Sequence, residues 1–186
     1  FDVARYIISI FSDKAEYGLD DGMTNLRLQK LLYLAQGYYL AEYGRPLFND
    51  DIEAWQYGPV VRDVYVKYSP FKSGILQDVP PEDGSLADDE EEMIIRVLGE
   101  FGKYSAGYLV NLTHAPGTPW DMVYDGEKRK IGKDRIKEYF STGKKLTGTE
   151  ELAERFATES AQKRGTTGHI VLPSDDYEEW EDSPDA

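Results

Sequence analysis

The sequence contains no cysteine, which removes disulfide bonds, thiolate metal ligands and thiol nucleophiles from consideration. It has only two histidines, His114 and His169, so a serine–histidine–acid system would have to use one of them. No Gly-x-Ser-x-Gly elbow, no dinucleotide-binding glycine pattern and no pair of histidines at i and i+4 occurs. These absences argue against the common catalytic classes and leave a chance pair of carboxylates as the remaining enzymatic reading.

Long apolar runs are also missing. No stretch approaches the roughly 20 apolar residues that a membrane helix needs. The N-terminus has no basic region followed by an apolar core, so the sequence gives no indication of secretion. A chain of 186 residues, 40% hydrophobic and 30% charged, fits one domain with an appendage. We expect a cytoplasmic protein.

Basic residues are scarce relative to acidic ones, and the net charge is −14. Residues 82–92 and 175–186 each hold seven acidic residues and no basic one. The other 21 acidic residues balance the 21 basic ones, so these two segments carry the whole excess. Acidic runs are most simply explained as solvated faces or helix-end charge. Because phosphate backbones repel such a chain, the charge argues against DNA binding.

Apolar residues at helical spacing indicate a mainly α-helical chain. The broadest apolar stripe runs from Thr24, a candidate N-cap, to Gly44, a candidate C-terminal stop. A helix apolar on most faces belongs at the centre of a bundle. Further helices are expected over residues 2–16, from Pro59 to about Ser69, from Ser85 to Gly102, over residues 104–114, from about Lys133, and from Thr147 to Gly165.

Two strands are expected near this bundle. Residues 52–56 alternate and contain a tryptophan, which favours a short strand, and residues 74–79 are a candidate partner. The predicted fold class is therefore mainly α (α+β): roughly five to seven helices around a central apolar helix, with a small antiparallel hairpin or sheet. The expected organisation is a folded domain over residues 1–146, a helix over 147–165 and an acidic extension over 166–186.

Four residues near turns are candidates for contact with a partner. His114 stands at a predicted helix end, where the simpler reading is that it caps carbonyls and packs on Trp120. Trp55 and Tyr57 precede Gly-Pro, where aromatic residues usually pack in a hairpin. Tryptophan and tyrosine are also favoured anchors of protein interfaces, so both readings stay open.

Four motifs in this order give the chain a family resemblance: LQKLLYLAQGYYL at residues 28–40, PLF at 46–48, EAWQYGPVVRDVY at 53–65 and NLTHAPGTPW at 111–120. Together they resemble the Panacea domain, also called the SocA-like antitoxin domain, a family that includes phage-associated proteins. The resemblance covers about residues 1–140. The residues that carry the resemblance could define the fold at least as readily as they could bind a partner. They are Leu28, Gln29, Leu32, Tyr33, Gln36, Trp55, Tyr57, Gly58, Pro59, His114, Pro119 and Trp120.

The resemblance implies an antitoxin that blocks a co-encoded protein toxin by direct binding, with no cofactor, no metal and no catalytic residue to carry over. Toxins of the family include alarmone-synthetase-like enzymes that modify tRNA. Some relatives deliver the toxin to a protease, so a proteolytic adaptor is an alternative. A small hydrolase-like enzyme with a carboxylate pair is another.

The acidic C-terminal extension carries two isolated aromatic residues, Tyr177 and Trp180. Acidic segments of this kind bury too little apolar surface to fold alone, but they can dock on a basic partner. We expect Tyr177 and Trp180 to add to toxin binding, with a solvated or folded-back tail as the alternative.

Overall fold

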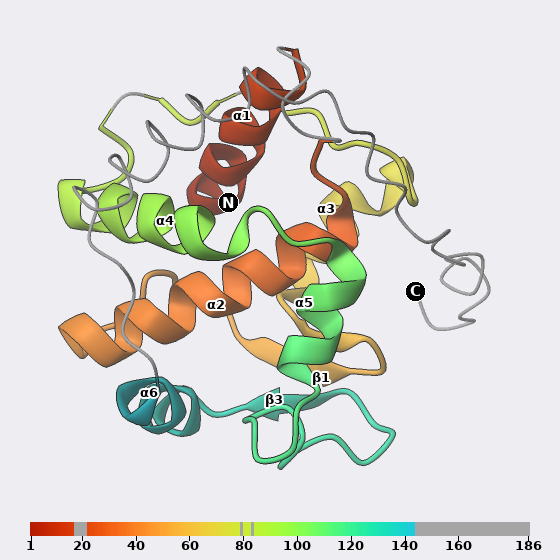
Figure 1. Cartoon of the computed structure of the whole chain (residues 1–186), viewed down its shortest axis with the longest axis vertical. Coiled ribbons are helices and arrows are strands. Elements are labelled where there is room, and N and C mark those ends of the chain that lie inside the picture. The colour runs from red at the N-terminus through yellow and green to blue at the C-terminus, as the bar shows by residue number, and fades with distance from the viewer. Residues whose placement is uncertain (17–21, 79, 83, 144–186) are drawn as a thin grey trace, which may run out of the picture.

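A computed structural model describes residues 1–16, 22–78, 80–82 and 84–143 of the chain (Figure 1). This part is mainly helical, with a small antiparallel sheet, as predicted. Its elements are α1 (Asp2–Glu16), α2 (Asn25–Tyr43), β1 (Ile52–Trp55), β2 (Gly58–Val60), α3 (Arg62–Tyr68), the 3-10 turn η1 (Ser69–Phe71), α4 (Asp88–Phe101), α5 (Ala106–Thr113), β3 (Arg129–Ile131) and α6 (Lys133–Thr142).

Helix α2 forms the centre of the fold. It begins after Thr24, whose hydroxyl accepts a hydrogen bond from the Arg27 backbone N–H, and it ends at Gly44, which adopts a left-handed φ of 71°. Both ends confirm the prediction from sequence. Helices α1, α3, α4, α5 and α6 and strand β2 pack around α2 (Figure 1). Fifteen of its 19 residues are buried as a result.

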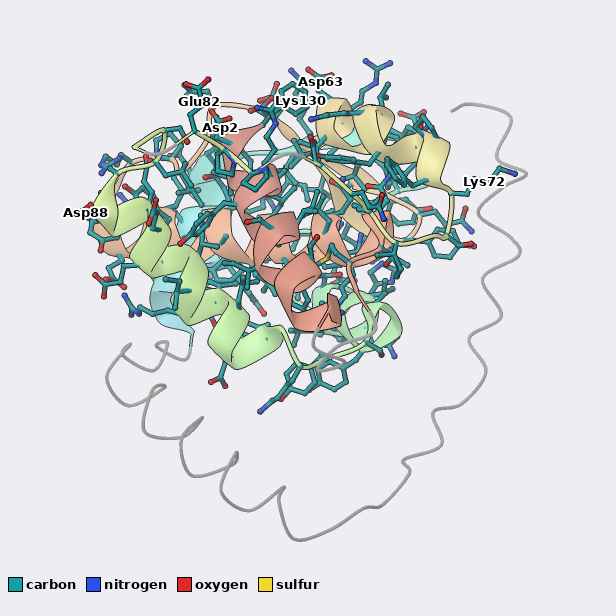
Figure 2. All side chains as sticks on the ribbon, turned by 90° about the horizontal axis from the view of Figure 1, so that it is seen from above. Asp2, Asp63, Lys72, Glu82, Asp88 and Lys130 are labelled. Carbon is teal, nitrogen blue, oxygen red and sulfur yellow. The ribbon has the colours of Figure 1, made fainter. Side chains whose placement is uncertain are left out.

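The surrounding helices turn apolar stripes toward α2 and bury them. Ile7, Ile8 and Phe11 of α1 are fully buried. Burial of an aliphatic or aromatic side chain of this size contributes about 1.5–3 kcal/mol to folding. Helix α6 approaches most closely, because a Cβ atom on Gly37 would lie 2.3 Å from the Phe140 ring. Glycine at position 37 therefore permits this packing. The charged side chains labelled Asp63, Lys72, Glu82 and Asp88 lie at the outside of the molecule (Figure 2).

The sheet has the strand order β2-β1-β3, and both pairings are antiparallel. Trp55 pairs with Gly58 across the β1–β2 turn, and Ile52 pairs with Ile131 of β3. The predicted strand at residues 52–56 is thus confirmed to within one residue. Its partners are Gly58–Val60 and Arg129–Ile131, so residues 74–79 are not the partner that we expected.

The prediction of a strand at residues 74–79 was wrong because residues 74–78 bond to the segment before α2 and to the end of α3 rather than to the sheet. The Leu76 backbone N–H donates to the Met23 carbonyl at 2.7 Å, and Leu76 is buried. The Gly74 N–H also donates to the Phe71 carbonyl at 2.8 Å, and the Asp78 carboxylate accepts from the Tyr68 hydroxyl at 2.5 Å. Of its residues, position 79 lies outside the described part.

Two helix starts also differ from the prediction. Pro59 lies in β2, and α3 begins three residues later, because the backbone at positions 59 and 61 bonds to side chains of α2 instead of entering a helix. Helix α4 begins at Asp88 rather than at Ser85. There the Glu90 carboxylate accepts from the Ala87 N–H at 3.0 Å, so the cap lies two residues beyond Ser85.

The predicted helix at residues 147–165 and the acidic extension at residues 166–186 lie outside the described residues. The acidic residues Asp88–Glu91 stand in the first turn of α4, as expected, where the helix dipole favours negative charge.

Candidate functional site

The β1–β2 turn brings Trp55 and Tyr57 to the surface beside the end of α5. Trp55 is the last residue of β1, and its indole N–H donates to the Glu53 carboxylate at 2.8 Å. Its ring packs edge-on against Tyr65 at 4.9 Å, and the Lys128 ammonium lies 4.1 Å from the ring centroid. The Trp55 ring is half-buried and fixed on several sides.

Three parallel rings lie next to Trp55. His114, the C-cap of α5, stacks on Trp120 with centroids 3.7 Å apart and planes inclined by 3°. Trp120 also stacks on Tyr124 at 4.6 Å. The Trp120 indole N–H donates to the Trp55 carbonyl at 2.8 Å, which ties the stack to β1. We call Trp55, His114, Trp120 and Tyr124 the Trp55–Trp120 cluster.

A buried lysine lies beneath the β1–β2 turn. Lys30 of α2 is fully buried, and its Nζ donates to the Pro59 carbonyl at 3.1 Å. Gly58 makes room for it: a Cβ atom there would lie 2.9 Å from Lys30 Cε and 2.8 Å from Thr113 Oγ1. Gly58 also has a φ of 100°, which glycine adopts without strain. Lys30, the turn and the end of α5 are therefore in direct contact.

Burial shifts the acid–base behaviour of two of these side chains. Removal from water lowers the pKa of Lys30 from 10.5 to about 7. Burial and the nearby Lys30 charge together lower the pKa of His114 from 6.5 to about 4. His114 is therefore neutral near pH 7. Its Nε2 atom is buried and has no hydrogen-bond partner among the described residues.

The structure brings together the sequence-predicted residues that it describes. Trp55, His114 and Trp120 are in one cluster, and Tyr57 belongs to the turn that follows Trp55. The expected packing of His114 on Trp120 is confirmed, while its Nε2 caps no carbonyl among the described residues. Tyr177 and Trp180 lie outside the described residues.

Sequence reasoning missed Lys30, Met122, Tyr124 and Lys128. Lys30 had a signal, since it stands four residues from Leu26 and from Leu34 within a helix that is apolar on most faces. The other three lie in the long connection between α5 and β3 (Figure 1), whose placement depends on contacts with β1. Met122 lies between Trp120 and Tyr124 in the chain, is 53% exposed, and accepts from the Arg135 guanidinium at 3.5 Å through its sulfur.

The cluster offers contact groups rather than an evident reaction centre. Among residues 1–16, 22–78, 80–82 and 84–143, no set of three or more histidine, aspartate or glutamate side chains is placed to hold a metal ion. None of the described helices is long and apolar enough to cross a membrane. Aromatic rings flanked by Met122 and Lys128 are the residue types that anchor protein interfaces.

Comparison with known proteins adds two findings. The family described as "Antitoxin SocA-like, Panacea domain" matches residues 28–121, which include α2 from Leu28 onward, the whole β1–β2 hairpin and Trp120. The chain is also similar to a protein of Caulobacter vibrioides (strain NA1000 / CB15N) described as "Antitoxin SocA". The two are 40% identical over 144 residues, covering 69% of this chain and 74% of the relative. No solved structure matches the chain.

Proposed function

Because this chain belongs to the SocA-like antitoxin family with the Panacea domain, we propose that it neutralises a co-encoded protein toxin by binding that toxin directly. We further propose that the Trp55–Trp120 cluster and the neighbouring Tyr57, Met122 and Lys128 form the contact surface. The observation that carries the proposal is the 2.8 Å hydrogen bond from the buried Trp120 indole to the Trp55 carbonyl. It helps to hold the half-buried rings of Trp55, His114 and Tyr124 in a fixed arrangement.

A fixed aromatic surface favours protein binding for an energetic reason. Rings already held by stacking and by hydrogen bonds lose little further freedom when a partner docks. Met122 adds an exposed, adaptable apolar side chain, and Lys128 adds a charge beside the Trp55 ring. Hot spots of protein interfaces commonly combine such anchors with a polar rim.

The antitoxin relative supports a binding role over a catalytic one, so we do not propose the carboxylate-pair enzyme. The acidic tail with Tyr177 and Trp180 remains a predicted second contact with the toxin, and it lies outside the described residues.

Co-expression tests the proposal directly. The product of the gene next to this one is expressed alone and then together with this chain, and growth and co-purification are measured. We expect growth arrest by the neighbour alone, rescue by co-expression, and a stable complex of the two proteins. A harmless neighbour, or rescue without any complex, would contradict the proposal.

The same experiment separates direct neutralisation from proteolytic delivery. Toxin abundance is followed after synthesis stops, in hosts with and without their main cytoplasmic proteases. Direct neutralisation predicts rescue in both hosts with undiminished toxin. Rescue that requires the protease and coincides with loss of the toxin would replace our proposal with the adaptor function.

A further inference from the structure

Lys30 is buried without the compensation that buried charges normally have. Its ammonium group has the Pro59 carbonyl as acceptor, and burial, rather than any charged partner, dominates its pKa shift. A buried ammonium is normally paired with a carboxylate or hydrated, since an isolated charge is costly away from water. Among the described residues, the acceptor at hydrogen-bond distance from Lys30 Nζ is the Pro59 carbonyl.

The β1–β2 turn and the residues that follow it lie directly against the Lys30 ammonium. Pro59 accepts its hydrogen bond, and Gly58 lies against its side chain. The turn also carries Trp55 and Tyr57, the residues that we propose to contact the toxin. Lys30 therefore touches the backbone that positions these two side chains, although it does not itself reach the surface.

We propose that Lys30 is the positioning residue of this turn: the turn closes over Lys30 when the amine is uncharged and opens when it is charged, so that acidification weakens partner binding. The reason is linkage. A charged amine favours conformations in which it reaches water, and lifting the Gly58–Pro59 backbone exposes it. The part of this inference that concerns binding rests on the proposed function, whereas the movement of the turn does not.

Among the described residues, the elements around this contact contribute few other titratable groups. Strand β2 contributes none, the turn contributes Tyr57, β1 contributes Glu53, and α5 contributes His114. The pKa of His114 is about 4 and that of Lys30 is about 7, so the two titrate in different ranges. A transition near pH 7 in the turn thus reports on Lys30.

Nuclear magnetic resonance of the free protein tests the movement. The backbone N–H of Tyr57 and Gly58 and the indole N–H of Trp120 are followed from pH 8.5 to pH 5.5. We expect a shared transition with a midpoint near 7 in the wild type and in His114→Phe. It should be absent in Lys30→Met, while Lys133→Met, which removes a surface lysine whose Nζ donates to the Asn49 carbonyl, should retain it.

If Lys30→Met does not fold, Lys30→Gln replaces it in the titration, because glutamine keeps a neutral hydrogen-bond donor. This variant should also lack the transition. A wild-type turn without a transition, or a transition that survives in the Lys30 variant, would overturn the inference. Affinity for the neighbouring gene product is then measured at pH 8 and pH 6. A roughly threefold to tenfold loss at pH 6 in the wild type, absent in the Lys30 variant, supports the binding part. If no complex forms at either pH, the proposed function fails while the result for the turn stands.

Discussion

Helix α2 and the end of α5 carry two kinds of buried polar group, which differ in how fully their hydrogen-bonding capacity is used. Gln36 accepts from the Leu47 and Phe48 N–H groups at 2.8 and 3.2 Å and donates to the Phe48 carbonyl at 2.8 Å. Gln29 accepts from Val61 N–H at 2.8 Å and donates to Asn25 at 3.1 Å. Gln36 thus completes the backbone bonding of the segment before β1, and Gln29 does so for the residue after β2.

Lys30 and His114 contrast with the two glutamines. Lys30 has the Pro59 carbonyl as acceptor for a charged group, and the buried His114 Nε2 has no partner among the described residues. The glutamines therefore stabilise the fold, whereas these two groups oppose it. Polar groups that are buried at a cost are candidates for function, because folding alone would favour apolar replacements. His114 belongs to the Trp55–Trp120 cluster, and Lys30 lies beneath the β1–β2 turn next to it.

Among the substitutions that test this contrast, Gln36→Leu should change the free energy of unfolding most. The change leaves two backbone N–H groups and one carbonyl without their buried partner, and each such loss costs about 1–3 kcal/mol. We expect the free energy of unfolding to fall by about 3 kcal/mol or more in urea denaturation. Gln77→Leu, at an exposed position, is the control and should stay within about 0.5 kcal/mol of the wild type. Equal effects in the two variants would refute a structural role for Gln36.

Replacing Lys30 with methionine should act in the opposite direction. A pKa that falls from 10.5 to about 7 on folding means that the folded state binds fewer protons than the unfolded state between these values. Stability therefore rises with pH above about 7, by up to about 1.4 kcal/mol per pH unit. Lys30→Met should remove this slope and raise the free energy of unfolding at pH 7 by about 1–3 kcal/mol, with the loss of the Pro59 hydrogen bond offsetting part of the gain.

The measurement for Lys30→Met is urea unfolding at pH 7, 8 and 9, alongside the wild type. Tyr33, Tyr39 and Tyr68 have raised pKa values, so their titration lies above this range. If the free energy of unfolding varied with pH in the same way in the two proteins, burial of Lys30 would not be the source of the pH dependence.

Replacing His114 with phenylalanine should have the smallest effect at neutral pH, because the stack on Trp120 is retained. The folded-state pKa of about 4 lies below the ordinary value of 6.5, so the wild type loses stability as the pH falls from 6.5 toward 4. Thermal unfolding at pH 7 and pH 5 should show a smaller acid-induced drop for His114→Phe. If the unfolding temperature fell equally in His114→Phe and in the wild type, a group other than His114 would cause the loss of stability in acid.

Local signals made α2 predictable from sequence, since Thr24 and Gly44 cap it and its apolar residues fix its central place. The start of α3 was not predictable in this way. Pro59 is compatible with a first helical turn, and only the distant Gln29 and Lys30 hold positions 59–61 in an extended form. Residue type identified Trp55, His114 and Trp120 as candidates. Met122 and Lys128 join them through tertiary placement of a loop that no local pattern determines.

The affinity of two matched surface variants for the neighbouring gene product tests the central claim most directly. Met122→Glu puts a charge between Trp120 and Tyr124 in the chain, next to Arg135, which can pair with it. Ile95→Glu makes the same kind of change on α4, at a residue that is 42% exposed against 53% for Met122. With both variants folded, we predict at least tenfold weaker binding for Met122→Glu and a change below twofold for Ile95→Glu. Weakened binding by Ile95→Glu, with Met122→Glu binding as the wild type, would contradict toxin recognition through this surface.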